Sequence, residues 1–175
     1  GAVDLGAGML NDVRALRREG ALAAAVDCGV PVCLMHMQGE PASMQQKPEY
    51  QDLVAEVQAF LAERSAACRE AGLRDNHILW DPGFGFGKSL SHNLQLFNAL
   101  PQLAEGGYPL LVGVSRKSML GAVTGRDVDQ RMAASVTMAA LAAERGAAIL
   151  RVHDVRETAD ALALVAALKQ EKEQV

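Results

Sequence analysis

The chain has 175 residues, of which 50% are hydrophobic and 4% aromatic, and a formal net charge of −4 at pH 7. That length suits one domain with a sizeable core, and the acidic balance argues against nucleic acid or an anionic membrane as a partner. The longest apolar run, 132–143, is shorter than the ~20 residues that a membrane span needs, and no secretory signal is expected. Cys28, Cys33 and Cys68 match no disulfide or metal spacing. We therefore expect a reducing cytoplasm, with each cysteine a small buried hydrophobe.

Short apolar runs alternate with helical patterns along the whole chain. The strands are predicted at 9–13, 30–36, 77–80, 109–114 and 148–152. The helices are predicted at 19–28, from Pro48 to Gly72, 90–104, 129–145 and from Asp154 to about 169, the last opened by a capping-box spacing. Because no hairpin dipeptide separates the strands, this alternation predicts five parallel strands with right-handed crossovers.

The segment 81–88, Asp-Pro-Gly-Phe-Gly-Phe-Gly-Lys, follows the third predicted strand. Its glycines allow positive φ and close approach of a ligand, and its two phenylalanines offer a surface for stacking. A P-loop is excluded because Pro82 stands where its first glycine is required, and a dinucleotide fingerprint fails because its third glycine falls on Lys88. The segment therefore indicates a binding loop; the plainer interpretation is an acidic turn before a helix.

Every predicted strand ends at polar residues: Asn11 and Asp12, His36, Asp81, 115–118, and Arg151 with His153. In α/β sheets and barrels the carboxyl ends of the strands are where sites are assembled. Arg151 and His153 are two residues apart and share one face of a strand. With Lys117 on a neighbouring strand they would form an anion site; the alternative is a solvated arginine beside a structurally bonded histidine.

Four blocks carry a resemblance to a known family: 34–39 (Leu-Met-His-Met-Gln-Gly), 81–88, 113–118 (Gly-Val-Ser-Arg-Lys-Ser) and 151–154 (Arg-Val-His-Asp). In this order and spacing they resemble dihydropteroate synthase. The resemblance implies a (β/α)₈ TIM barrel and a transferase of folate synthesis, which is a sulfonamide target. That enzyme joins 6-hydroxymethyl-7,8-dihydropterin diphosphate to p-aminobenzoate and releases diphosphate. It also implies Mg²⁺ as cofactor and a homodimer formed through helices near the carboxyl end.

The resemblance also implies roles for residues on the pterin side of the site. Asp81 would accept hydrogen bonds from the amino-pyrimidinone edge of the pterin, a pairing that a carboxylate can make in parallel. Asn11 would bond another part of that edge, and Met37 would lie against the ring. Lys117 would bond the carbonyl side of the pterin and line the p-aminobenzoate site.

On the p-aminobenzoate side, the resemblance places Phe86 on the ring and Ser118 near the carboxylate, with Phe84 and Gly113 shaping the pocket. The departing diphosphate would be held by a cation and an imidazole, which stabilise the growing negative charge. The residues implied as catalytic are Lys117, Arg151 and His153.

The chain departs from the family in length, because a complete barrel has eight strands and ~250 residues. We therefore expect residues 1–175 to be a single, incomplete domain, a partial barrel that lacks the first three βα units and, with them, the Mg²⁺ ligand. Opening a barrel should expose inward aliphatic side chains at ~1.5–3 kcal/mol each, so the chain alone is expected to be inactive.

Three alternatives remain open. The chain could be a module that binds a pterin without turnover, or a pterin-using methyltransferase barrel, which would share Asp81 but not the 115–118 block. A doubly wound open sheet is the alternative fold. It would place the polar strand ends along a line instead of around a ring.

Overall fold

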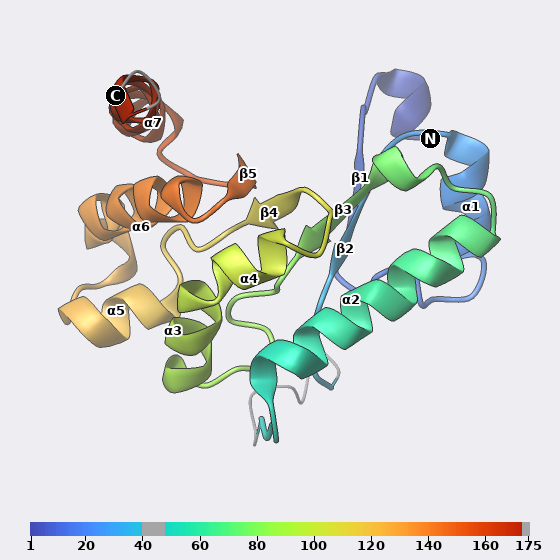
Figure 1. The fold of residues 1–175 in the computed structure, drawn as a ribbon, viewed down its shortest axis with the longest axis horizontal. Helices are drawn as coiled ribbons and strands as arrows, with labels where there is room; N and C mark the ends of the chain where they lie inside the picture. Colours follow the sequence, from blue (N-terminus) through green and yellow to red (C-terminus); the bar gives the residue numbers. More distant parts are fainter. Residues whose placement is uncertain (40–47, 173–175) are drawn as a thin grey trace.

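The computed structural model describes residues 1–39 and 48–172. Its strands form one parallel sheet in the order β1-β2-β3-β4-β5 (Figure 1). Their bounds are β1 Leu10–Asp12, β2 Val32–Met35, β3 Ile78–Asp81, β4 Leu110–Val112 and β5 Ala147–Leu150. Spatial order follows chain order without reversal, as in a barrel, whereas a doubly wound sheet reverses at a switch point. The prediction of five parallel strands from a partial barrel is confirmed.

The helices lie along the convex side of this curved sheet, with α6 and α7 beyond β5 (Figure 1). Their bounds are α1 Ala21–Cys28, α2 Leu53–Glu70, α3 Leu90–Asn98, α4 Leu100–Ala104, α5 Ser118–Thr124, α6 Met132–Glu144 and α7 Val155–Lys172. Short 3₁₀ turns occupy Val3–Leu5, Asp75–His77 and Val128–Gln130. No helix in the described ranges is long and apolar enough to cross a membrane.

Several helix boundaries differ from the prediction for local reasons. Helix α2 begins after Asp52, whose carboxylate accepts a hydrogen bond from the Ala55 amide, and not at Pro48. The segment predicted as one helix at 90–104 is two, because the chain breaks at Ala99 and restarts with Pro101 in the first turn of α4. Helix α5 was not predicted; it is short, and no side chain caps its start.

The two faces of the sheet pack in different ways. Residues on the convex face belong to the main core shared with the helices: Val32, Leu34, Ile78, Trp80, Leu110 and Val112. On the concave face, Cys33, Leu79 and Leu111 form a second cluster, with Met9 packed against it. These two sets alternate along each strand because successive side chains point to opposite faces.

The concave face is more buried than expected for an open barrel. Cys33, Leu79 and Leu111 are each at most 7% exposed, because curvature of the sheet brings their side chains together. The expectation that inward aliphatics stand in water is therefore wrong for Leu79 and Leu111, while Ile149 on β5 is 37% exposed. Cys33 and Cys68 are buried as expected, but Cys28, at the end of α1, is exposed, which corrects that prediction.

Candidate functional site

The concave face continues past the ends of the strands into a layer of polar residues. Asp81 pairs in register with Met35 and stands two residues beyond Leu79, so it shares the concave face. Asn11, the middle residue of the three-residue β1, lies in register with the inward Cys33. Arg151 follows β5 two residues after Ile149. The carboxyl ends of β1, β3 and β5 thus present an amide, a carboxylate and a guanidinium toward one side.

The Arg151 side chain crosses this layer and connects three strand ends. Its Nη2 donates to Oδ2 of Asp81 at 3.2 Å, and its Nη1 donates to Oδ1 of Asn11 at 3.3 Å. Gly113 leaves room for the crossing, since a Cβ there would lie 2.6 Å from Nη2 of Arg151. The arginine expected to hold diphosphate is therefore bonded to the two residues expected to hold the pterin edge.

Asp81 is buried and fixed from two directions. Only 1% of the residue is exposed, and its Oδ1 accepts a hydrogen bond from the Gly83 amide at 2.8 Å. Gly83 has φ +71°, and a Cβ there would stand 1.8 Å from the carbonyl oxygen of His36. The glycine therefore lets the loop after β3 pack directly on the chain after β2.

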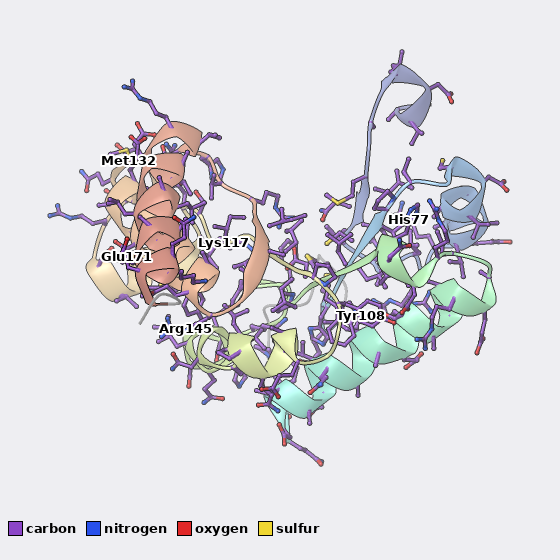
Figure 2. All side chains as sticks on the ribbon, turned by 45° about the horizontal axis from the view of Figure 1, so that its top comes forward. His77, Tyr108, Lys117, Met132, Arg145 and Glu171 are labelled. Carbon is purple, nitrogen blue, oxygen red and sulfur yellow. The ribbon has the colours of Figure 1, made fainter. Side chains whose placement is uncertain are left out.

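Lys117 reaches the glycine loop from the segment after β4. Its Nζ donates to the Phe84 carbonyl and lies 5.0 Å from the centre of the Phe86 ring. Burial lowers the pKa of Lys117 to about 8; the Asp81 carboxylate opposes this shift and Arg151 adds to it. Figure 2 shows Lys117 well apart from Tyr108, which precedes β4, as expected for residues at opposite ends of a strand.

The turn that carries Lys117 is held in a strained shape. Arg116 has φ +57°, a left-handed conformation that costs a bulky residue about 1–2 kcal/mol. Its amide donates to Ser135 Oγ at 2.9 Å, and its carbonyl accepts from Arg131 at 3.0 Å. Its guanidinium makes two hydrogen bonds, of 2.5 and 3.2 Å, with Asp154. This pair ties the Lys117 turn to the start of α7 and engages the carboxylate that was expected to open a capping box.

His153 is oriented by Ser115, a residue to which the sequence analysis gave no role. Ser115 Oγ lies 2.9 Å from His153 Nδ1 and also accepts from the His153 amide at 3.2 Å. A cavity of about 180 Å³ opens beside this pair. It is lined by Gly113, Ser115, Lys117, Arg151, Val152 and His153.

Six predicted site residues lie outside this lining. Two of them, Asn11 and Asp81, are bonded to Arg151; the other four are Met37, Phe84, Phe86 and Ser118. Phe84 was expected to shape the pocket. Its side chain is fully buried and packs on Phe97 with ring centres 5.9 Å apart, and its carbonyl accepts from Lys117, so its role in the pocket stays a prediction. Met37 is buried after β2, and Phe86 is partly buried. Ser118 is exposed at the first position of α5.

The sequence analysis missed the residues that support the loop. Lys88 and Asn93 are both buried, and the Asn93 side chain accepts from the Gly85 amide at 2.7 Å and donates to the Lys88 carbonyl. The sequence carried a usable signal for Lys88, which ends a segment with three glycines. A lysine buried there needs nearby carbonyls for its ammonium. The Nδ1 atom of His36 lies 2.9 Å from Lys88 Nζ. His36 thus supports the glycine loop and does not line the cavity.

Residues 1–39 and 48–172 contain no group of three or more His, Cys, Asp or Glu side chains arranged to hold a metal. Asp81, the carboxylate of the site, is already bonded to Arg151 and Gly83.

Burial of His36 predicts a pH-dependent stability. Burial, and to a lesser degree the Lys88 and Arg17 charges, lower the pKa of His36 from 6.5 to about 3. Below pH 6.5 the His36 side chain takes up a proton in the unfolded chain but not in the folded chain. The contribution of His36 to stability is therefore fully present above pH 6.5 and is lost as the pH falls toward 3. We expect up to about 1.4 kcal/mol of loss per pH unit from this group. Urea unfolding at several pH values should show a shallower dependence in His36→Gln, and equal slopes would contradict the assignment.

The sequence and the fold both match one family. Residues 1–153 match the family described as pterin binding enzyme. The chain belongs to the pterin-binding enzymes. Dihydropteroate synthases of Haemophilus influenzae and Escherichia coli are 49% and 48% identical to it, over 92% and 97% of this chain but 58% and 60% of their own length. The resemblance to dihydropteroate synthase drawn from the four sequence blocks is confirmed.

Solved structures of this family agree with the fold. A Yersinia pestis dihydropteroate synthase in complex with a sulfonamide drug superimposes with a TM-score of 0.95 at 47% identity, covering 97% of this chain and 62% of that chain. A Xanthomonas albilineans dihydropteroate synthase with 4-aminobenzoic acid gives 0.89 at 53% identity, covering 96% of this chain and 60% of that chain. The chain thus spans about 60% of the length of these family members.

Proposed function

We propose that these residues form the pterin pocket and part of the anion site of a dihydropteroate synthase. The observation that supports it most is the convergence of three strand ends: Lys117, Arg151 and His153 line one cavity, and Asp81 is bonded to Arg151. The substrates are a pterin diphosphate and p-aminobenzoate. Structures of the Xanthomonas relative hold 4-aminobenzoic acid, the second of these substrates, and 7,8-dihydropteroate, the product. We place the reaction in the cytoplasm.

In the reaction, the bond between the pterin methylene carbon and the diphosphate oxygen breaks, and the amine nitrogen of p-aminobenzoate bonds to that carbon and loses a proton. Asp81 accepts the N–H edge of the pterin. The Arg151 guanidinium and the His153 imidazole face the oxygens on which negative charge grows, where fixed donors stabilise the transition state more than the ground state. Mg²⁺ bound with the diphosphate would neutralise charge, through ligands other than those described.

Substrate binding must rearrange the Asp81–Arg151 pair. A pterin edge that donates to Asp81 takes the position now held by Nη2 of Arg151. The released guanidinium remains above Gly113, beside the cavity that His153 lines. Arrival of the pterin thus frees the cation that the leaving group requires.

The isolated 175-residue chain should bind the pterin diphosphate and form no product. Titration calorimetry with the substrate and Mg²⁺ should show heat, while dihydropteroate formation stays at the level of a boiled control. Product above that control would overturn the predicted inactivity, and absence of heat would overturn the pterin site.

A binding module without turnover is the second candidate. It is supported by the contacts of Arg151 with Asn11 and Asp81, the two residues proposed to bind the pterin edge. Substituting this chain for the matching stretch of the Escherichia coli enzyme separates the two. A synthase predicts a chimera that forms dihydropteroate, and a binding module predicts one that binds the pterin without product.

We also propose that the protein forms a homodimer through its carboxyl-terminal helices. Leu164 and Leu168 of α7 are 69% and 64% exposed, and at a spacing of four residues they share one face of the helix. Sedimentation of the 175-residue chain should show a dimer, and a monomer would contradict this proposal.

A further inference from the structure

Lys88 ends the glycine loop, and the proposed function leaves its ammonium without a role. The residue is 3% exposed. Its Nζ lies 2.9 Å from His36 Nδ1, 3.0 Å from the Gly83 carbonyl and 3.1 Å from the Phe86 carbonyl. An ammonium has three N–H donors, so these contacts engage all of them. The lysine therefore points into its own loop and is not directed at a phosphate.

The two carbonyls that Lys88 binds belong to residues that shape the site. The amide of Gly83 holds the Asp81 carboxylate, and the ring of Phe86 lies beside the Lys117 ammonium. Lys88 thus connects the start of the loop, which fixes the acid, with its far end, which faces the second lysine.

Other contacts hold the loop at different points. Asn93 binds the amide of Gly85, and the Tyr50 hydroxyl donates to the Gly87 carbonyl at 2.7 Å. Neither joins Gly83 to Phe86; one backbone hydrogen bond does, from the Phe86 amide to the Gly83 carbonyl at 3.1 Å, and Lys88 adds the side-chain link between the two carbonyls. Removing the Lys88 ammonium would leave the Phe86 carbonyl and the His36 nitrogen facing a buried space, which is costly for polar groups, and would leave the Gly83 carbonyl with the Phe86 amide as its donor.

We propose that Lys88 is a positioning residue, whose ammonium holds loop 83–87 in the shape that presents Asp81 and Lys117 to a pterin. The identity of the ligand in this proposal rests on the proposed function. The effect of Lys88 on the loop is independent of it.

The charges around Lys88 agree with this role. Burial lowers its pKa to about 7; Asp81 opposes the shift and Lys117 adds to it. Lys88 also contacts His36, and the Arg17 charge acts on that histidine. A neutral amine has two N–H donors for three acceptors. The hydrogen bonds that Lys88 makes to the loop therefore weaken as its amine loses its proton.

The test compares Lys88→Met with Lys169→Met, which removes an exposed lysine bonded to the Ala143 carbonyl. Calorimetry with 6-hydroxymethylpterin should show affinity about tenfold lower for Lys88→Met, the size expected for losing such hydrogen bonds, and no change for Lys169→Met. Hydrogen exchange at the Gly83 and Phe86 amides should accelerate more than at Leu34 in β2. Lys88→Arg, which keeps N–H donors, should restore part of this protection.

Equal protection of the loop amides in folded Lys88→Met, with unchanged affinity, would overturn the proposal.

If Lys88→Met does not fold, NMR of the unmodified chain tests the proposal instead. Below the pKa of about 7 the Lys88 nitrogen should appear as a slowly exchanging ammonium, and its titration should shift the carbonyl carbons of Gly83 and Phe86 together. Carbonyl carbons that do not respond would overturn the proposal. If the unmodified chain binds no pterin, the proposed function fails, while the exchange comparison still tests Lys88.

Discussion

Gly83→Ala is expected to lower the free energy of unfolding by about 3–5 kcal/mol, a large part of a domain's stability, and to abolish pterin binding. The residue has φ +71°, and an added Cβ would lie 1.8 Å from the carbonyl oxygen of His36. That oxygen belongs to the backbone directly after β2, so a rotamer change of a neighbour does not relieve the overlap. The loop must move, and with it the amide that holds Asp81.

Gly125→Ala is the matched control, because Gly125 has φ +70° and nothing lies within 4 Å of a Cβ there. It carries the same left-handed strain without the clash, so we expect a loss of about 1–2 kcal/mol. Urea unfolding followed by fluorescence of Trp80, the one tryptophan of the chain, gives both values. Equal losses in the two variants would mean that the contact between the loops carries no energy.

Asp81→Asn is expected to weaken pterin binding by about 10²–10³-fold, because hydrogen bonds to an ionised partner contribute up to ~3 kcal/mol each. The carboxylate offers acceptors for two adjacent N–H groups of the pterin, whereas an amide offers one acceptor and adds a donor. Arg151 also loses its ionised partner. Calorimetry with 6-hydroxymethylpterin measures the loss.

The control for this variant is Asp75→Asn, at the other end of β3. Asp75 is exposed and accepts from the Tyr108 hydroxyl at 2.7 Å. Both it and Tyr108 precede strands of the sheet, and Tyr108 lies far from Lys117 in Figure 2. We expect unchanged affinity. An Asp81→Asn protein that binds as tightly as this control would contradict the pterin edge assignment.

The sequence by itself determined the order of the elements and the strand ends that carry chemistry. Apolar runs such as 30–36, found as β2 Val32–Met35, are readable because a strand covered on both faces is apolar throughout. Gly29 ends α1 in the left-handed conformation, as predicted from glycine's freedom at that position. Asp81, Lys117, Arg151 and His153 were named from their places after strands.

The tertiary structure decided which of these residues meet, and how. Arg151 and Asn11 are 140 positions apart, and no local pattern shows that one guanidinium would bond both Asn11 and Asp81. Two phenylalanines of one loop looked alike, yet Phe84 turns into the core and Phe86 stays at the site, because the turn at Gly85 (φ +78°) reverses the chain between them. The sequence could flag Lys88 as a residue of the glycine loop, but its three partners, His36, Gly83 and Phe86, are known from the fold. Periodicity and turn chemistry act over a few residues, whereas the burial of a charge depends on acceptors that distant strands bring together.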